Sequence, residues 1–285
     1  MKIAISGSNG YIAGNLIPVL VAAGHVIIRI NRMALADVDA LSEQITGTDA
    51  VINFAGAPIF SQWTSAKKKE ILESRVISTR NLVKTINMLP EEKRPKLFIS
   101  SSAIGIYKSN YNHTEESRAF ADNFVGNVVK NWENASLDLS SSTRKVIFRI
   151  GLVLGSGAKT MKNLIPLFKI GLGGKIGKGD QPFPFIHIND VIDAIVWGIS
   201  NKNANGIYNL VAPQMIDNRQ FTKALAKAVK RPAIFTVPAF ALKMILGETS
   251  SLLLQNPMVI PEKLTQQGFR FEFPDIESCL EQITK

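Results

Sequence analysis

The apolar residues of this chain alternate between short runs and longer segments with helical spacing. Short runs rich in β-branched residues occur at 3–5, 26–30, 50–54, 97–100 and 146–149, and a later one at 207–210. Helical spacing marks 11–23, 75–88 and 122–139, and it returns at 189–200 with Asn189 as the expected N-cap. Strands that alternate with helices are typical of a parallel sheet with helices on both faces. We therefore expect an α/β fold with a doubly wound parallel sheet.

The pattern changes after Gly155. Glycines gather at 171–179, and from Pro213 onward the elements are short, mostly helical and separated by prolines. We predict a dinucleotide-binding domain over 1–155, completed by about 186–212. The segments 156–185 and 213–285 are predicted to form a smaller, mostly helical substrate lobe. Within that lobe, the apolar stretch from Phe240 to Leu246 is predicted to be an amphipathic core helix, with an interface helix as the alternative.

Composition and charge limit the classes of partner. The formal net charge is +10, but the basic residues are scattered and are not interleaved with aromatics, so we expect neither nucleic acid nor membrane as a partner. No apolar run reaches the length of a membrane-spanning helix, and the N-terminus lacks the features of a secretory signal. We expect a small-molecule substrate and a cytoplasmic, reducing location. The single cysteine, Cys279, is predicted to be a small buried side chain, and a homodimer is left open.

A glycine-rich turn joins the first predicted strand to the first predicted helix. It reads Gly7-Ser8-Asn9-Gly10-Tyr11-Ile12-Ala13. Glycines let the backbone turn sharply and approach a pyrophosphate, which the free N–H groups at a helix N-terminus bind. Because the turn lies between a strand and a helix, we interpret it as the cofactor loop of a Rossmann fold and not as a plain β–α turn.

The residues after the second strand predict which dinucleotide is bound. NAD-binding sheets place an acidic residue there to hold the ribose hydroxyls, whereas this chain has Asn31 and Arg32. An arginine can bind the 2′-phosphate of NADP(H), and no carboxylate stands there to repel it. We predict NADP(H), with NAD(H) as the alternative cofactor. An ordinary exposed arginine at a strand end is the alternative interpretation of Arg32.

These features resemble the extended short-chain dehydrogenase/reductases, the group that includes nucleotide-sugar epimerases and dehydratases. Besides the glycine loop, the resemblance rests on 49–56, 100–103, 149–155 and 185–190, and it covers nearly the whole chain. The tail from Pro238 to Phe271 narrows it to an atypical epimerase-like subfamily. Its members are NAD-dependent epimerase/dehydratase-like proteins with a C-terminal domain of unknown function, and most lack an assigned substrate.

The resemblance implies roles for individual residues. Residues that would lie along the cofactor are Asn53, Phe54, Ala55 and Gly56 under the adenosine and pyrophosphate, Arg75 near a ribose, Ile150 beside the nicotinamide, and Ser100 at a strand end. For Ser100 the alternative is a small residue that hydrogen-bonds to the backbone. Ser102 matches the catalytic serine of the family, and a purely structural role is equally compatible with its position.

Two departures from the family pattern limit the chemistry. The catalytic tyrosine and the lysine one helical turn later are replaced by Phe124 and Val128, and no tyrosine of this chain has a lysine four residues later. Tyr107 is the nearest substitute donor, with a packed aromatic as the favoured alternative. Phe183 replaces an arginine that often binds the diphosphate of nucleotide sugars, and an aromatic wall is expected there.

We therefore predict an NADP(H)-binding oxidoreductase for a small, mainly apolar carbonyl or hydroxyl compound, with Ser102 and Tyr107 as candidate catalytic residues and no metal. A non-catalytic NADP(H)-binding regulatory protein is the alternative, and a nucleotide-sugar epimerase is disfavoured.

Overall fold

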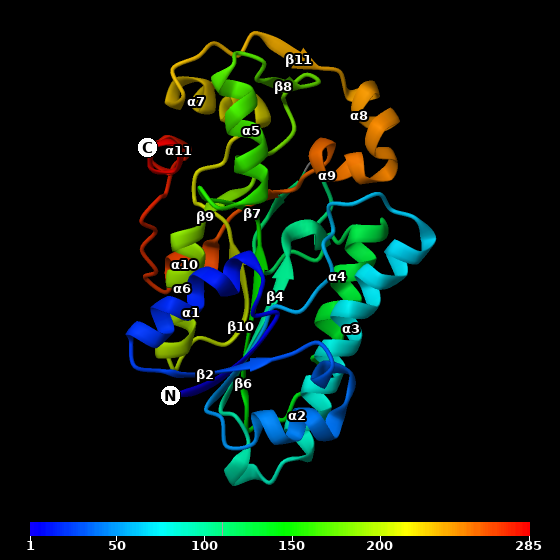
Figure 1. Cartoon of the computed structure of the whole chain (residues 1–285), viewed down its shortest axis with the longest axis vertical. Coiled ribbons are helices and arrows are strands. Elements are labelled where there is room, and N and C mark those ends of the chain that lie inside the picture. Colours follow the sequence, from blue (N-terminus) through cyan, green and yellow to red (C-terminus); the bar gives the residue numbers. More distant parts are fainter. Residues whose placement is uncertain (110) are drawn as a thin grey trace.

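The central element of the fold is a six-stranded parallel sheet. A computed structural model describes residues 1–109 and 111–285 (Figure 1). The strands are β1 (Lys2–Ser6), β2 (Val26–Ile30), β3 (Ala50–Asn53), β4 (Leu97–Ala103), β6 (Arg144–Ile150) and β10 (Gly206–Leu210). Their order is β10-β6-β4-β3-β1-β2, and every neighbouring pair is parallel. The chain turns to opposite sides of β1, which places a ligand crevice at the carboxyl ends of β1 and β3. The predicted α/β fold is confirmed.

Helices cover both faces of this sheet. On one face α1 (Tyr11–Ala22) and α6 (Ile188–Ser200) pack over Ile3 and Ile5 of β1. On the other face α2 (Val38–Ile45) and α3 (Ser65–Met88) pack over Ala4 and Val51, and α4 (Phe124–Asn134) lies beside α3. Alternate residues of a strand point to opposite faces, so β1 contributes to both cores.

Three helix starts differ from the sequence prediction, and one of them is that of α4, which covers Phe124–Asn134 and not 122–139. The α3 helix begins at Ser65 and not at residue 75, because the Thr64 side chain caps it by accepting a hydrogen bond from the Lys67 amide at 3.2 Å. The α6 helix begins at Ile188, and its N-cap is His187, whose Nδ1 accepts from the Asn189 amide at 3.2 Å. The predicted cap at Asn189 was wrong because the ring nitrogen of His187 serves as the acceptor two residues earlier.

The C-terminal lobe lies beyond the carboxyl edge of the sheet, at the top of Figure 1. Its elements are α5 (Lys159–Lys169), β8 (Gly174–Ile176), α7 (Asn218–Ala228), β11 (Phe235–Val237), α8 (Ala239–Leu246), the 3₁₀ helix η4 (Gly247–Ser250), α9 (Ser251–Leu254) and α11 (Ile276–Thr284). A second apolar core forms around Phe168, Phe221 and Leu280. Cys279 belongs to it and is fully buried, as predicted.

Short elements complete the fold. They are β5 (Asn112–His113) paired with β12 (Met258–Val259), β7 (Leu152–Leu154) paired with β9 (Phe185–His187), α10 (Glu262–Gln266), and the 3₁₀ helices η1 (Ala34–Ala36), η2 (Glu91–Lys93) and η3 (Ile104–Ile106). In the part of the chain that the structure describes, no helix is both long enough and apolar enough to cross a membrane.

The α8 helix corrects the prediction of a core helix in the lobe. None of its residues is buried, and Phe240, Met244 and Ile245 are 66%, 74% and 75% exposed. The helix runs along the outside of the lobe between β11 and η4 (Figure 1). Apolar residues on several sides of a short helix do not reveal which side has a neighbour, so the sequence pattern could not predict this exposure.

Candidate functional site

The β1–α1 turn has the geometry of an anion-binding loop. Gly7 has φ +64°, and a Cβ built on it would lie 2.6 Å from the carbonyl oxygen of Phe54, so this position requires glycine. Gly10 is the N-cap of α1 and supplies no capping side chain, and the first turn contains no acidic residue. The first N–H groups of α1 are therefore available to an external anion.

Asn53 holds the end of β3 against this turn. Its side chain is fully buried, accepts from the Ser6 hydroxyl at 2.6 Å and donates to Thr79 Oγ1 at 2.8 Å. The same side-chain oxygen accepts from the Ala55 amide at 3.2 Å. The hydrogen-bonding groups of the Asn53 side chain are thus bound to other protein groups, so this side chain supports the turn. Gly56, three residues later, is exposed at the crevice.

Arg75 of α3 lies directly beneath Gly56. A Cβ on Gly56 would come within 3.0 Å of the Arg75 Cζ. The guanidinium donates to the carbonyl of Ile71 at 3.0 Å and lies 5.3 Å from the ring of Trp132. No ion pair among the described residues includes Arg75, and burial lowers its pKa to about 10. A partly buried cation without a carboxylate partner favours binding of an anion.

Arg32 adds a second cation at the same edge of the sheet. It follows β2 in an exposed turn that the Asn31 side chain fixes by accepting from the Ala34 amide at 2.8 Å. Its charge reaches Glu70 at the start of α3, where it contributes to lowering the pKa of that carboxyl after the larger effect of Lys67. The α1 N-terminus, Arg32 and Arg75 will be called the cofactor edge. This edge carries positive charge with no carboxylate bound to either arginine among the residues the structure describes.

The two candidate catalytic residues, Ser102 and Tyr107, belong to one buried network. Ser102 Oγ donates to Glu133 Oε1 at 2.5 Å, and Arg149 donates to both Glu133 oxygens, at 2.8 and 2.7 Å. Arg149 also donates to the Tyr107 hydroxyl at 2.7 Å, and Tyr107 donates to Asn209 Oδ1 at 2.8 Å. Ser102, Tyr107, Arg149 and Asn209 are at most 4% exposed. We call these five residues the Glu133–Arg149 network.

Electrostatics keep Arg149 charged and Tyr107 neutral within this network. Burial lowers the pKa of Arg149, but the hydrogen bonds and charge of Glu133 outweigh that effect and hold it above the ordinary value. Burial raises the pKa of Tyr107, which keeps its phenol protonated. The hydrogen of the Ser102 hydroxyl is directed at Glu133, and the Tyr107 hydroxyl is directed at Asn209. Both side chains are therefore engaged inside the protein.

Ser100 lies in the middle of β4 and not at a strand end as expected, because β4 continues to Ala103, whereas Ile150 is the last residue of β6; both have little exposure. Ser100 is 3% exposed, and its hydroxyl donates to the carbonyl of Ser101 at 3.1 Å. Ile150 is 9% exposed and pairs with Ala103 and Leu210 in the sheet. The Ser100 side chain thus has a backbone partner, which is the alternative that the sequence left open.

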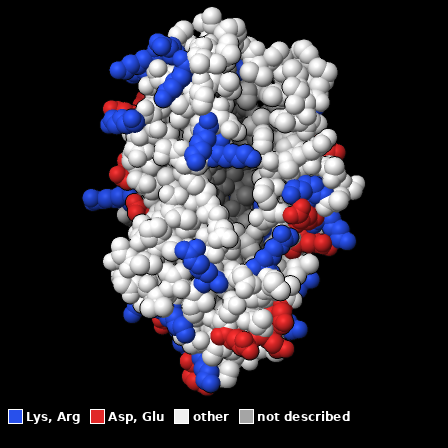
Figure 2. Space-filling model, viewed as in Figure 1, with Lys and Arg blue, Asp and Glu red and all other residues white. Residues whose placement is uncertain are grey.

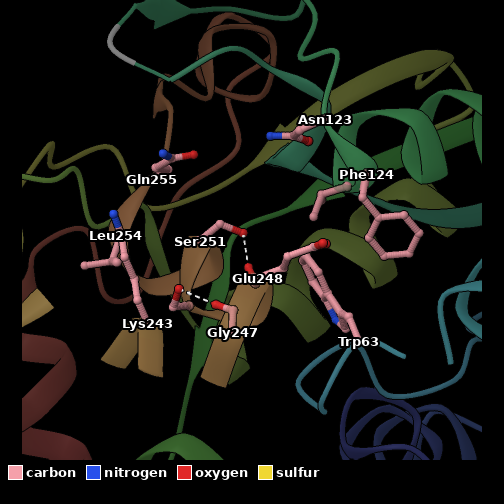
Figure 3. Close-up of a pocket in the computed structure, with 11 residues that line it drawn as sticks. Trp63, Asn123, Phe124, Lys243, Gly247, Glu248, Ser251, Leu254 and Gln255 are labelled. Atoms are coloured by element: carbon pink, nitrogen blue, oxygen red, sulfur yellow. Dashed lines mark hydrogen bonds between the residues drawn. The ribbon is translucent and has the colours of Figure 1, made fainter. Parts of the chain in front are cut away.

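A cavity of about 430 Å³ lies between the start of α4 and the C-terminal lobe (Figure 3). Its lining residues are Trp63, Asn123, Phe124 and Val125 from the sheet domain and Lys243, Gly247, Glu248, Ser250, Ser251, Leu254 and Gln255 from the lobe. Phe124, the residue in place of the family's tyrosine, meets Trp63 edge to face with ring centroids 4.9 Å apart. The Trp63 Nε1 donates to the carbonyl of Ile59 at 2.8 Å, which fixes the ring.

Contacts between the lobe and the sheet domain close one side of this cavity. Glu248 forms an ion pair with Lys68 of α3, and Thr249 donates to the carbonyl of Ser61 at 2.7 Å. Lys68 also lies 5.4 Å from the centre of the Phe124 ring. The sequence had singled out Phe124 but not Trp63, Lys243 or Glu248, since no local motif marks residues that converge from separate loops.

The same face of the molecule is hollowed at its centre, between its upper and lower parts, and Lys and Arg side chains lie around the hollow (Figure 2). Phe183 is partly buried, and its ring stacks on Phe221 of α7 with centroids 4.0 Å apart and packs against the second core. Within residues 1–109 and 111–285, no group of three His, Cys, Asp or Glu side chains is arranged to hold a metal ion.

Comparison with known proteins agrees with this architecture. Residues 3–210 match the model of the NAD dependent epimerase/dehydratase family, and residues 237–283 match a domain of unknown function, DUF1731. The chain is 31% identical to the bovine epimerase family protein SDR39U1 (99% of each chain) and 31% identical to the Bacillus subtilis epimerase family protein YfhF (99% of this chain, 98% of that one).

A solved structure gives a similar result. Human epimerase family protein SDR39U1, crystallised with NADPH, superposes with a TM-score of 0.93 at 30% identity, covering 100% of this chain and 99% of that one. The glycine loop, the sheet order, the C-terminal lobe and these matches lead to one conclusion. The chain belongs to the NAD-dependent epimerase/dehydratase family, with a C-terminal domain like that of the SDR39U1 proteins.

Proposed function

We propose that this protein binds NADP(H) at the cofactor edge and acts as an oxidoreductase on a small, mainly apolar carbonyl or hydroxyl compound. The observation that carries the proposal is the 430 Å³ cavity, which lies beside Phe124 at the helix where the family has its catalytic tyrosine. The aromatic pair on its wall suits an apolar substrate body better than a nucleotide diphosphate.

The cofactor edge fits NADP(H). Residues 7–12 would bind the pyrophosphate at the N-terminus of α1, and Arg32 would bind the 2′-phosphate. Arg75 would lie near a ribose. Along the same groove would lie Phe54, Ala55, Gly56 and Ile150. The positive φ of Gly7 supports this fit, and so does Arg75, which has no carboxylate partner among the described residues. The human relative was solved with NADPH. When bound, the cofactor supplies or accepts the hydride.

For the proton we propose Ser102, assisted by water. In the oxidation direction its oxygen would accept the proton of the substrate hydroxyl while its own proton passes to Glu133, and in the reduction direction the same relay would run in reverse and deliver a proton to the carbonyl oxygen. Tyr107 would act through Arg149, which orients Glu133, and not as a donor to the substrate. This arrangement lacks the tyrosine–lysine pair of the family, and we expect slow turnover.

The alternative is a non-catalytic NADP(H)-binding regulatory protein. The observation that favours it is the engagement of both Ser102 and Tyr107 inside the Glu133–Arg149 network. A nucleotide-sugar epimerase is the least supported, because Phe124 replaces the acid/base residue and Phe183 is packed on Phe221.

The experiment is an assay of purified protein with NADPH against apolar ketones and aldehydes, with UDP-glucose as the comparison. We expect slow NADPH-dependent reduction of apolar carbonyls and no epimerisation. Ser102→Ala should lower kcat by a factor of about ten or more while leaving NADPH affinity unchanged. Tight NADPH binding without turnover on any compound would favour the regulatory alternative, and rapid UDP-glucose turnover would contradict both.

A further inference from the structure

We propose that the cavity beside Phe124 selects a substrate that carries a carboxylate: an apolar carbonyl compound whose acid group binds at Lys243. This inference rests on the proposed function, since it names the substrate class of the same site. In Figure 3 the cavity has two unlike ends, with Trp63 and Phe124 on one side and Lys243 and Gln255 on the other.

The aromatic end suits the reacting part of an apolar compound. The Trp63 and Phe124 rings are held edge to face, and Trp63 is further fixed by its bond to Ile59. Val125 and Leu254 add aliphatic surface to the lining. Burial of a flat or branched hydrocarbon body against such a wall is favourable. Phe124 also marks the position of the reacting group in the family, so the carbonyl belongs at this end.

The opposite end has a cation without a counter-ion. Lys243 lies on the exposed side of α8, and none of the ion pairs found among the described residues includes it. Glu248 is the only carboxylate in the lining, and it is already paired with Lys68. Those two charges compensate each other, so the cavity keeps the positive charge of Lys243.

A carboxylate at this end would have two kinds of partner. The Lys243 ammonium offers a charge-assisted hydrogen bond, and the amide of Gln255, on the same side of the cavity, can donate a second. A cationic substrate would find no free carboxylate in the lining, because Glu248 already forms an ion pair with Lys68, and the charge of Lys243 would repel it. The volume of the cavity suits a compound with one ring and one acid group.

Calorimetric titration with matched probes tests the inference. The probes are 4-acetylbenzoate, its neutral amide 4-acetylbenzamide, and the cation 4-acetylbenzylamine, each titrated into the protein saturated with NADP⁺. We expect the acid to bind about two- to fivefold more tightly than the amide, as an exposed charge pair provides, and the amine to bind most weakly. The preference should shrink at high salt.

Substitutions of Lys243 test whether this residue causes the preference for the acid. Lys243→Met should abolish the preference for the acid, and Lys243→Arg should keep it. Lys223→Met, which removes an exposed lysine of α7 outside the cavity lining, serves as the matched control and should change nothing. Leu254→Trp should fill the cavity and weaken all three probes while leaving thermal stability and NADPH binding as in the unmodified protein.

The result that overturns the inference is equal affinity for acid and amide, a preference that survives in Lys243→Met, or no binding of any probe. Its failure can be told apart from failure of the proposed function by measuring turnover of the same ketones with NADPH. If the acid binds at Lys243 but is not reduced, the site stands and oxidoreduction fails. If ketones are reduced with no preference for the acid, the proposed function stands and this inference fails.

Discussion

Two groups of polar side chains lie at the carboxyl edge of the same sheet, and they differ in how much of their bonding capacity the protein itself uses. In the Glu133–Arg149 network, each named hydroxyl, carboxylate and guanidinium has a protein partner within 2.8 Å. At the cofactor edge, the α1 N-terminus has no capping side chain and Arg75 has no carboxylate partner in the described part of the chain. Complete pairing indicates that the network stabilises the fold, in addition to the part proposed for Ser102 in proton transfer, whereas unused donors indicate a ligand. The two groups should therefore respond in opposite ways to substitution.

The largest expected effect is on stability, in the network. Glu133→Ala would leave Arg149 buried without a counter-ion, and we expect the free energy of unfolding to fall by about 3–5 kcal/mol. Urea denaturation measures this change. Glu116→Ala, which removes an exposed carboxylate outside the network, is the control and should leave the free energy of unfolding unchanged. A loss below about 1 kcal/mol for Glu133→Ala would show that the network is not structural.

The next largest effect is on cofactor binding, at the glycine loop. Gly10→Val places a branched side chain where the pyrophosphate approaches, and we expect NADPH affinity to fall at least about a hundredfold with the fold retained. A Cβ at Gly10 lies 3.1 Å from the Gly7 carbonyl oxygen, a contact that a small shift relieves. Gly7→Val should instead disrupt folding, because its Cβ would meet Phe54 at 2.6 Å. Normal NADPH binding by folded Gly10→Val would mean that the loop has another role.

Arg75 offers the sharpest contrast with Arg149. We expect Arg75→Met to weaken NADPH binding by about 1.5–3 kcal/mol, the range for a hydrogen bond to a charged group. The same substitution should leave the free energy of unfolding unchanged or raise it, since it removes a partly buried charge without a carboxylate partner among the described residues. Calorimetry and denaturation of the ligand-free protein measure the two quantities. Large destabilisation with unchanged affinity would place Arg75 with the structural group.

The smallest effect concerns the choice between the two dinucleotides. We expect NADPH to bind more tightly than NADH by about 1–2 kcal/mol, and Arg32→Ala to erase most of that difference by weakening NADPH alone. Arg29→Ala, an exposed arginine within β2, is the control and should keep the preference. Equal affinities of the unmodified protein for NADPH and NADH would refute the role of Arg32.

The cofactor edge and the Glu133–Arg149 network also differ in how far the sequence predicts them. The glycine loop, the strand alternation and Arg32 are local patterns, so the sheet and the cofactor loop followed from them. Glu133 carries no local signal, and its meeting with Ser102 and Arg149 depends on how α4 packs on β4 and β6. The cavity likewise joins Trp63 to residues from 243 to 255, a convergence that only the packing of the lobe on the sheet domain creates.

The most direct test of this account is a crystal structure of the protein with NADPH. We expect the pyrophosphate on the backbone of residues 7–12, the 2′-phosphate at Arg32, and the nicotinamide facing the cavity beside Phe124. The Glu133–Arg149 network should keep all its internal hydrogen bonds in the complex. A nicotinamide that lies away from the cavity, or a cofactor whose phosphates contact neither the α1 N-terminus nor Arg32, would contradict the account.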